Sequence, residues 1–298
     1  MYDQISTNKL KSIGLVAVFM LLVLAVGWAF GYFTQWGTGG FILALLFAFV
    51  SAFGSYWYSD RIVLAISRAR PVDKQTDPYL VNVIEGLAIA AGLPTPAAYV
   101  IDDPAPNAFA TGRNPEHAAI AVTTGLVEKL DRLELEGVVA HEMAHVKNYD
   151  TLVQTLAAVM AGTVVLLSEW VLRAWFWGGG KRRSNNDSGP LGLVLIVVAL
   201  LLLVLSPLFA ALIQTAISRK REYLADANSA SLTRYPAGLA GALRKIAADT
   251  NQLAAANKAT ESLYIYNPLK DIREGKGMNA LFNTHPPIEE RIRRLEEM

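Results

Sequence analysis

Long apolar stretches constrain this chain more than any other feature, because about 20 consecutive apolar residues can cross a bilayer as a helix. Lys9 and Lys11 precede the first stretch, Ile13 to Phe33, and a second extends from Phe41 to Tyr58. We expect the two to form a transmembrane hairpin within residues 1–70. A cleaved signal peptide is the alternative for the first stretch, but the stretch is longer than the apolar region of a typical signal peptide and further apolar sequence follows it.

Two more apolar stretches, Leu152 to Ser168 and Leu191 to Ile217, lie beyond the middle of the chain. Hydrophobic residues make up 53% of the 298 residues and the mean hydropathy is +0.30, which is typical of a membrane protein. We therefore predict four transmembrane helices in contact with the lipid bilayer, the second pair within residues 152–217. Whether this second hairpin crosses the bilayer completely is left open.

Basic residues predict the orientation of these helices, because cytoplasmic flanks are enriched in Lys and Arg. The outer flanks of the first hairpin are basic, whereas its loop, residues 34–40, carries no charge. The loop between the third and fourth stretches contradicts this pattern, but inverting the protein would place still more basic residues outside. We expect both termini and the soluble region to be cytoplasmic. The basic residues of the flanks are Lys9, Lys11, Arg61, Arg68, Arg70, Arg219, Lys220 and Arg221, and those of the loop are Lys181, Arg182 and Arg183.

Net charge and cysteine content exclude several classes of site. The formal net charge is +1 and the basic residues lie in short clusters, so nothing indicates nucleic-acid binding. The chain has no cysteine, which excludes disulfides and cysteine-bound metals. Any metal ligands must therefore come from His, Asp and Glu.

A region of soluble character begins at Pro71. Apolar residues recur at helical spacing from Asp77 to Gly92, and Ala97 to Asp102 and His117 to Thr123 have the composition of short strands. We predict an α+β domain with a small β-sheet, formed by residues 71–151 together with residues 218–298. The whole fold is expected to be mainly α.

The sequence His141-Glu142-Met143-Ala144-His145 carries the clearest chemical signal. On a helix, residues four apart share a face, so His141 and His145 can bind one zinc ion while Glu142 acts as general base toward a water on the metal. Asp131 and Glu134 form a D-x-x-E capping pattern that would start this helix. Nothing requires the helix to end soon after the motif. The alternative is a pair of surface histidines.

A catalytic zinc site needs a third protein ligand. If the third and fourth apolar stretches form an antiparallel hairpin centred near Ser184, His145 lies level with Glu222 and His141 lies level with Asp226. We therefore predict Glu222 as the third ligand and Asp226 as the residue that orients a ligand imidazole. In the alternative interpretation, both carboxylates lie on the helix surface and pair with Arg219 and Arg221.

Together these motifs resemble those of the HtpX-type membrane zinc peptidases, relatives of the CAAX prenyl proteases. The matching elements are H-E-M-A-H, S-R-K-R-E-Y-L-A-D from Ser218, P-N-A-F-A-T-G from Pro106 and T-H-P-P from Thr284. The resemblance implies a gluzincin-like zinc protease domain with one zinc per chain, bound by His141, His145 and Glu222. It also implies substrate binding at Asn107 and stabilisation of the oxyanion by His285. The alternative roles are a turn residue for Asn107 and a helix cap for His285.

These features predict a membrane-bound zinc endopeptidase that cleaves polypeptides with a zinc-activated water. The resemblance further implies a bacterial or archaeal cell membrane, a link to stress, and misfolded membrane proteins as substrates in quality control. One alternative is a processing peptidase of the prenyl-protease type with a specific substrate. The other is a membrane scaffold or chaperone in which zinc clamps two helices, but no clear fourth ligand is present in the sequence.

Overall fold

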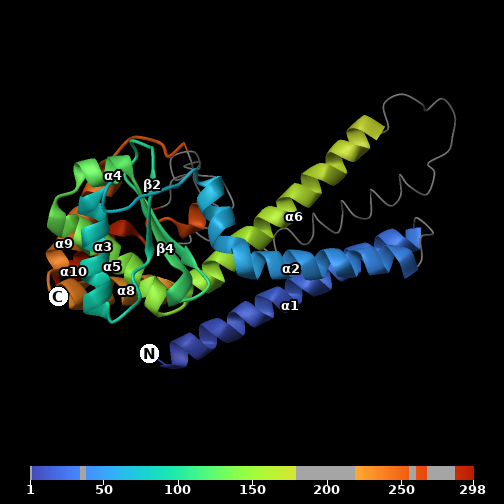
Figure 1. Cartoon of the computed structure of the whole chain (residues 1–298), viewed down its shortest axis with the longest axis horizontal. Coiled ribbons are helices and arrows are strands. Elements are labelled where there is room, and N and C mark those ends of the chain that lie inside the picture. Colours follow the sequence, from blue (N-terminus) through green and yellow to red (C-terminus); the bar gives the residue numbers. More distant parts are fainter. Residues whose placement is uncertain (1, 34–37, 179–218, 255–259, 267–285) are drawn as a thin grey trace.

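The computed structural model describes residues 2–33, 38–178, 219–254, 260–266 and 286–298. Three long helices extend away from a rounded domain that contains the sheet (Figure 1). They are α1 (Tyr2–Phe33), α2 (Thr38–Ile66) and α6 (Asp150–Gly178). Near the domain they share an apolar core in which Phe19 of α1 and Leu156 and Met160 of α6 are fully buried.

Two of these helices are long and apolar enough to cross a membrane, within the part of the chain that the structure describes. The qualifying segments are Ile5–Ala25 and Phe41–Ile66, which overlap the two spans predicted for the first hairpin. The third predicted span lies in α6, where the apolar segment Asp150–Val164 is shorter. The fourth, residues 191–217, lies outside the described residues, so the prediction of four spans stays a prediction.

The domain contains a mixed sheet in the order β1-β2-β4-β3. Strand β2 (Ala97–Ile101) runs parallel to β4 (Ala118–Thr123), and both edge strands, β1 (Arg70–Pro71) and β3 (Ala108–Gly112), are antiparallel to their neighbours. The sheet and its two central strands were therefore predicted correctly. Strand β3 was not, because every one of its residues is buried and it lacks the polar and apolar alternation that marks a half-exposed strand.

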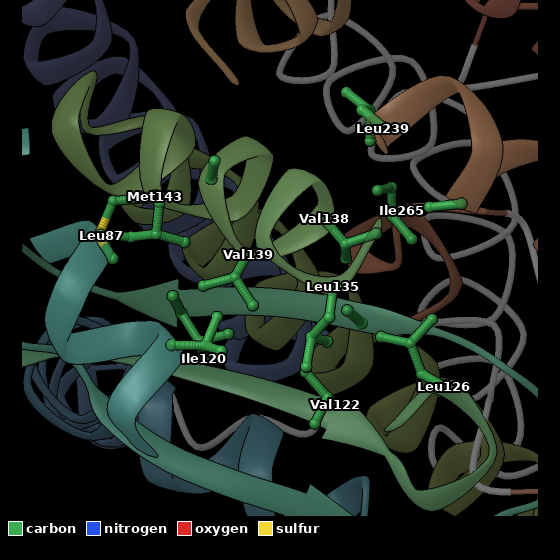
Figure 2. Close-up of a cluster of buried hydrophobic side chains, with 14 of the residues drawn as sticks. Leu87, Ile120, Val122, Leu126, Leu135, Val138, Val139, Met143, Leu239 and Ile265 are labelled. Atoms are coloured by element: carbon green, nitrogen blue, oxygen red, sulfur yellow. The ribbon is translucent and has the colours of Figure 1, made fainter. Parts of the chain in front are cut away.

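Helices cover both faces of this sheet. One face packs against α3 (Pro78–Ala91) and α5 (Arg132–Lys147); Figure 2 shows side chains of α5 directed toward Ile120 of β4 and Leu87 of α3. The other face, which includes Phe109 and Ala121, packs against the ends of α2 and α6. The other helices of the described residues are α4 (Thr124–Lys129), α8 (Arg219–Thr233), α9 (Pro236–Ala248), α10 (Ile288–Glu296) and the 3₁₀ turns η1 (Pro115–His117) and η2 (Glu261–Leu263).

Helix α5, which carries the H-E-x-x-H motif, is fixed at its start and along one side. Its start has the predicted capping box, in which the Asp131 carboxylate accepts a hydrogen bond from the Glu134 backbone and the Glu134 carboxylate accepts one from the Asp131 backbone. In its middle, Gly137 lets α9 approach closely, since a Cβ atom there would lie 2.6 Å from the backbone nitrogen of Leu239. The motif is thus part of a rigid, buried element.

The motif helix ends sooner than the sequence indicated. Helix α5 stops at Lys147, and Tyr149 has a positive φ of 59° before α6 begins at Asp150. A residue other than glycine rarely adopts this conformation, so the surrounding contacts must hold it. The resulting bend brings the first residue of α6 back toward the motif, which an uninterrupted helix would not do.

Candidate metal centre

The two histidines of the motif face each other, as their spacing predicts. Their Nε2 atoms lie 3.2 Å apart and both side chains are buried. Glu222, from the first turn of α8, brings its carboxylate to 3.7 Å from His141 Nε2 and 3.5 Å from His145 Nε2. One donor atom from each of these three residues lies within 4.8 Å of the others. The structure thus gathers the three predicted ligands at one point.

The spacing of these donors fits a metal ion. Ligand atoms about 2.0–2.1 Å from a tetrahedral zinc ion lie about 3.3–3.4 Å from each other. The two Nε2 atoms are 3.2 Å apart, and each lies 3.5 or 3.7 Å from a carboxylate oxygen of Glu222, which is close to this value. Two imidazoles and one carboxylate also form a common donor set of catalytic zinc sites. The residues present are therefore suited to bind zinc.

A carboxylate lies against the outer nitrogen of each imidazole. Asp226 Oδ1 is 2.9 Å from His141 Nδ1, and Asp150 Oδ2 is 3.0 Å from His145 Nδ1. Such contacts hold a proton on Nδ1 and direct Nε2 toward the point where the three ligands meet. Asp226 lies where the sequence analysis put it. Asp150 was missed because, in an uninterrupted helix, a residue five positions after His145 would point elsewhere.

A buried arginine, Arg291, joins the site from the C-terminal helix α10. It forms two hydrogen bonds with Asp226, of 2.9 and 2.7 Å, and lies 3.7 Å from Glu222. Its charge offsets the carboxylates, which in turn raise the pKa of Arg291 further despite its burial. The sequence did contain a signal: Ile288, Arg291 and Leu295 share the apolar face of a short amphipathic helix.

Glu142 is fully buried beside these ligands. Burial is the main cause that raises the pKa of Glu142 to about 7, and the nearby Glu222 adds to it. The nearby His145 and a hydrogen bond from the backbone of Ala110 in β3 act in the opposite direction and lower this pKa. Such a carboxyl can both take up and release a proton near neutral pH, as a general acid–base group requires.

Protonation of the two histidines differs. Burial lowers the pKa of His141, so its imidazole is neutral and can bind metal. Burial would lower the pKa of His145 as well, but the hydrogen bond with Asp150 and the nearby Glu222 together raise it to about 9. A metal ion must therefore displace a proton from His145 when it binds.

Of the two residues taken from the resemblance, Asn107 is described by the structure and bonds to other groups than the three ligands. Asn107 immediately precedes β3, and its amide is engaged within the protein: Nδ2 donates to the Tyr266 carbonyl at 2.9 Å, and Oδ1 accepts from the Ala108 backbone at 3.1 Å. Its role in substrate binding stays a prediction. His285 lies outside the described residues. His117 is exposed and bonds to Asn114, away from the centre.

Sequence comparisons with known proteins point to one family. Residues 74–298 match the model of peptidase family M48. A protease HtpX homolog of Dictyoglomus thermophilum is 48% identical over the whole chain and 94% of its own length, and one of Streptococcus pneumoniae serotype 4 is 46% identical over the full length of both. The crystal structure of S. mikatae Ste24p resembles the fold with a TM-score of 0.51 and 21% identity, covering 99% of this chain and 67% of that one.

Proposed function

Because the chain belongs to the HtpX type of peptidase family M48, and is thus a metallopeptidase, we propose that it is a membrane-bound zinc endopeptidase with His141, His145 and Glu222 as ligands. The observation that carries this proposal is the convergence of these three buried residues beside Glu142. The identity of the metal rests on the donor set and on the spacing of its atoms.

When bound, zinc would supply a Lewis acid for the scissile carbonyl and would lower the pKa of a water molecule. Glu142 takes the proton from the attacking water and passes it to the leaving amine, so that one carboxyl serves as base and then as acid. Asp226 and Asp150 keep the Nε2 atoms of the two histidines directed at the metal. Arg291 compensates the negative charge of Asp226 and Glu222.

Substrate recognition is proposed to rely on the polypeptide backbone. Strand β3 is an edge strand of the sheet, and the backbone of Ala110 in this strand hydrogen-bonds to Glu142. An extended substrate could pair with such an edge through main-chain hydrogen bonds, which select little for sequence. Low selectivity suits the quality control of misfolded membrane proteins. Asn107 at the start of β3 and His285 stay candidates for contacts with the substrate and its oxyanion.

Two alternative functions differ in testable ways. A scaffold with a structural zinc would need a fourth protein ligand, and the cluster found among the described residues has three. A processing peptidase would use the same centre but would cleave a defined peptide and spare unfolded membrane proteins. Comparing the two kinds of substrate with the reconstituted protein therefore separates general from specific cleavage.

Chelation is the direct test of the proposed function. The full-length protein, purified and reconstituted in liposomes, is expected to contain about one zinc per chain and to cleave an unfolded membrane protein. A chelator should abolish cleavage, and added zinc should restore it. The zinc-free form should also be digested faster by an added protease, because the metal joins α5 to α8. Cleavage that persists after zinc is removed would contradict the proposal.

We also propose that the catalytic domain faces the cytoplasm and that the chain crosses the membrane four times. The basic flanks of the first hairpin support this orientation. A topology reporter inserted after Arg183 should then report an external location, while one at the C-terminus reports a cytoplasmic one. A cytoplasmic signal from both insertions would reduce the number of spans to two.

A further inference from the structure

Asp150 has a second set of partners besides the metal-site histidine. Its Oδ2 atom contacts His145, while Oδ1 accepts hydrogen bonds from Asn8 Nδ2 at 2.7 Å and from Arg221 Nη1 at 2.8 Å. Asn8 belongs to α1, which precedes the motif by more than 100 residues. The orientation of a proposed metal ligand is thus linked, through one carboxylate, to the first helix of the chain.

The side-chain amide of Asn8 forms hydrogen bonds with three residues around the site. Besides Asp150, Nδ2 donates to the backbone carbonyl of Asn148 at 2.8 Å, and Oδ1 accepts from Arg221. Asn148 caps the end of α5, Asp150 begins α6, and Arg221 directly precedes the predicted ligand Glu222 on α8. One side chain therefore holds the bend between α5 and α6 and connects it to α8.

The position of Asn8 on α1 is also informative. Asn8, Ser12, Leu15 and Phe19 follow one another at helical spacing, and all four are buried. The apolar members pack against α6, so α1 is held in a fixed register along that helix. Figure 1 shows the N-terminal end of α1 beside the domain and its other end far from it. The buried face of α1 thus ends in a polar residue at the metal centre.

We propose that Asn8 is a positioning residue through which α1 fixes the Asp150 carboxylate and thereby the imidazole of His145. The proposal rests on the proposed function, in which His145 binds the metal. A buried amide with its donors and acceptor bonded is costly to replace, because its partners lose hydrogen bonds that water cannot supply. Any change that shifts α1 along α6 would weaken the metal site without touching a ligand.

Zinc affinity of full-length protein in detergent, measured by competition with a chelator, tests this proposal. Replacing the partner of a liganding histidine typically lowers metal affinity about 10–100-fold, so Asp150→Ala should fall in this range and Asn8→Ala near its lower end. Asn8→Leu keeps the size of the side chain without its polar atoms and should behave like Asn8→Ala. For both Asn8 variants we expect kcat to fall while KM stays nearly unchanged, since no contact with substrate is lost.

Ser12→Ala is the matched control. Ser12 is buried one turn further along α1, but within the described part of the chain its hydroxyl bonds to the Asn8 carbonyl of the same helix and to no residue of the site. This variant should keep native zinc affinity and kcat. The double variant Asn8→Ala/Asp150→Ala should bind zinc with the same affinity as Asp150→Ala alone, because Asn8 acts through Asp150.

Three results would overturn the inference: native zinc affinity in Asn8→Ala, an equal loss in Ser12→Ala, or additive losses in the double variant. Native zinc affinity in Asn8→Leu would show that the packing of this side chain matters rather than its hydrogen bonds, and would also overturn the inference. Absence of zinc binding by the native protein would instead refute the proposed function on which the inference depends. The two failures are therefore distinguishable.

Discussion

Replacing Glu142 with Gln is expected to abolish peptide cleavage while the protein keeps its zinc. Loss of a general acid–base group typically lowers the rate by about 10²–10⁴-fold. The amide has the same shape as the carboxylate but cannot take a proton from water, and Glu142 is not among the three residues that converge as ligands. The measurement is kcat with reconstituted protein, together with the zinc content of the same sample.

Glu136→Gln is the matched control, because it makes the same chemical change on the same helix. Glu136 pairs with Arg132 near the start of α5, away from the ligands. Its variant should cleave at the native rate. If Glu142→Gln retained chelator-sensitive cleavage at a native rate, the assignment of Glu142 as the base would be wrong.

The central part of this site could be predicted from sequence because it depends on local regularity. Helical spacing alone directs His141 and His145 to one point, and the same spacing places Glu222 and Asp226 on one face of α8. Two such helices need only pack side by side, as α5 and α8 do, for the pairs to meet. The sequence analysis paired His145 with Glu222 and His141 with Asp226, and the structure has both contacts. This holds although α5 and α6 are separate helices, because the pairing depends only on how far along α8 each motif residue lies.

The residues that sequence reasoning missed depend on contacts between distant segments. Asp150 reaches His145 because the chain bends at Tyr149, and no simple sequence pattern marks that residue for a positive φ. Asn8 meets Asp150 only through the packing of α1 on α6. Strand β3 was missed for a related reason, because its burial on both faces removes the alternation that identifies a strand. Each of these features requires the tertiary fold.

Arg291 is expected to contribute strongly to the stability of the metal-free domain. It is buried and bonded to Asp226 with two hydrogen bonds, and Glu222 lies close by. Removing one partner of a buried ion pair leaves the other charged and unsolvated, which typically costs about 3–5 kcal/mol. Arg291→Met should therefore lower the stability of the zinc-free protein by about this amount, measured by denaturant unfolding of the full chain in detergent.

Arg293→Met serves as the matched control for this prediction. Arg293 lies two residues further along α10 and is exposed, and its pairing with Glu290 at the surface contributes little to stability. Combining Arg291→Met with Asp226→Asn should recover part of the lost stability, because the uncompensated carboxylate is then gone. Equal stability of the Arg291 and Arg293 variants would show that the buried charges at the metal centre are compensated in another way. If the double variant instead recovers part of the stability, Arg291 stabilises the buried carboxylates of Asp226 and Glu222 before the metal binds.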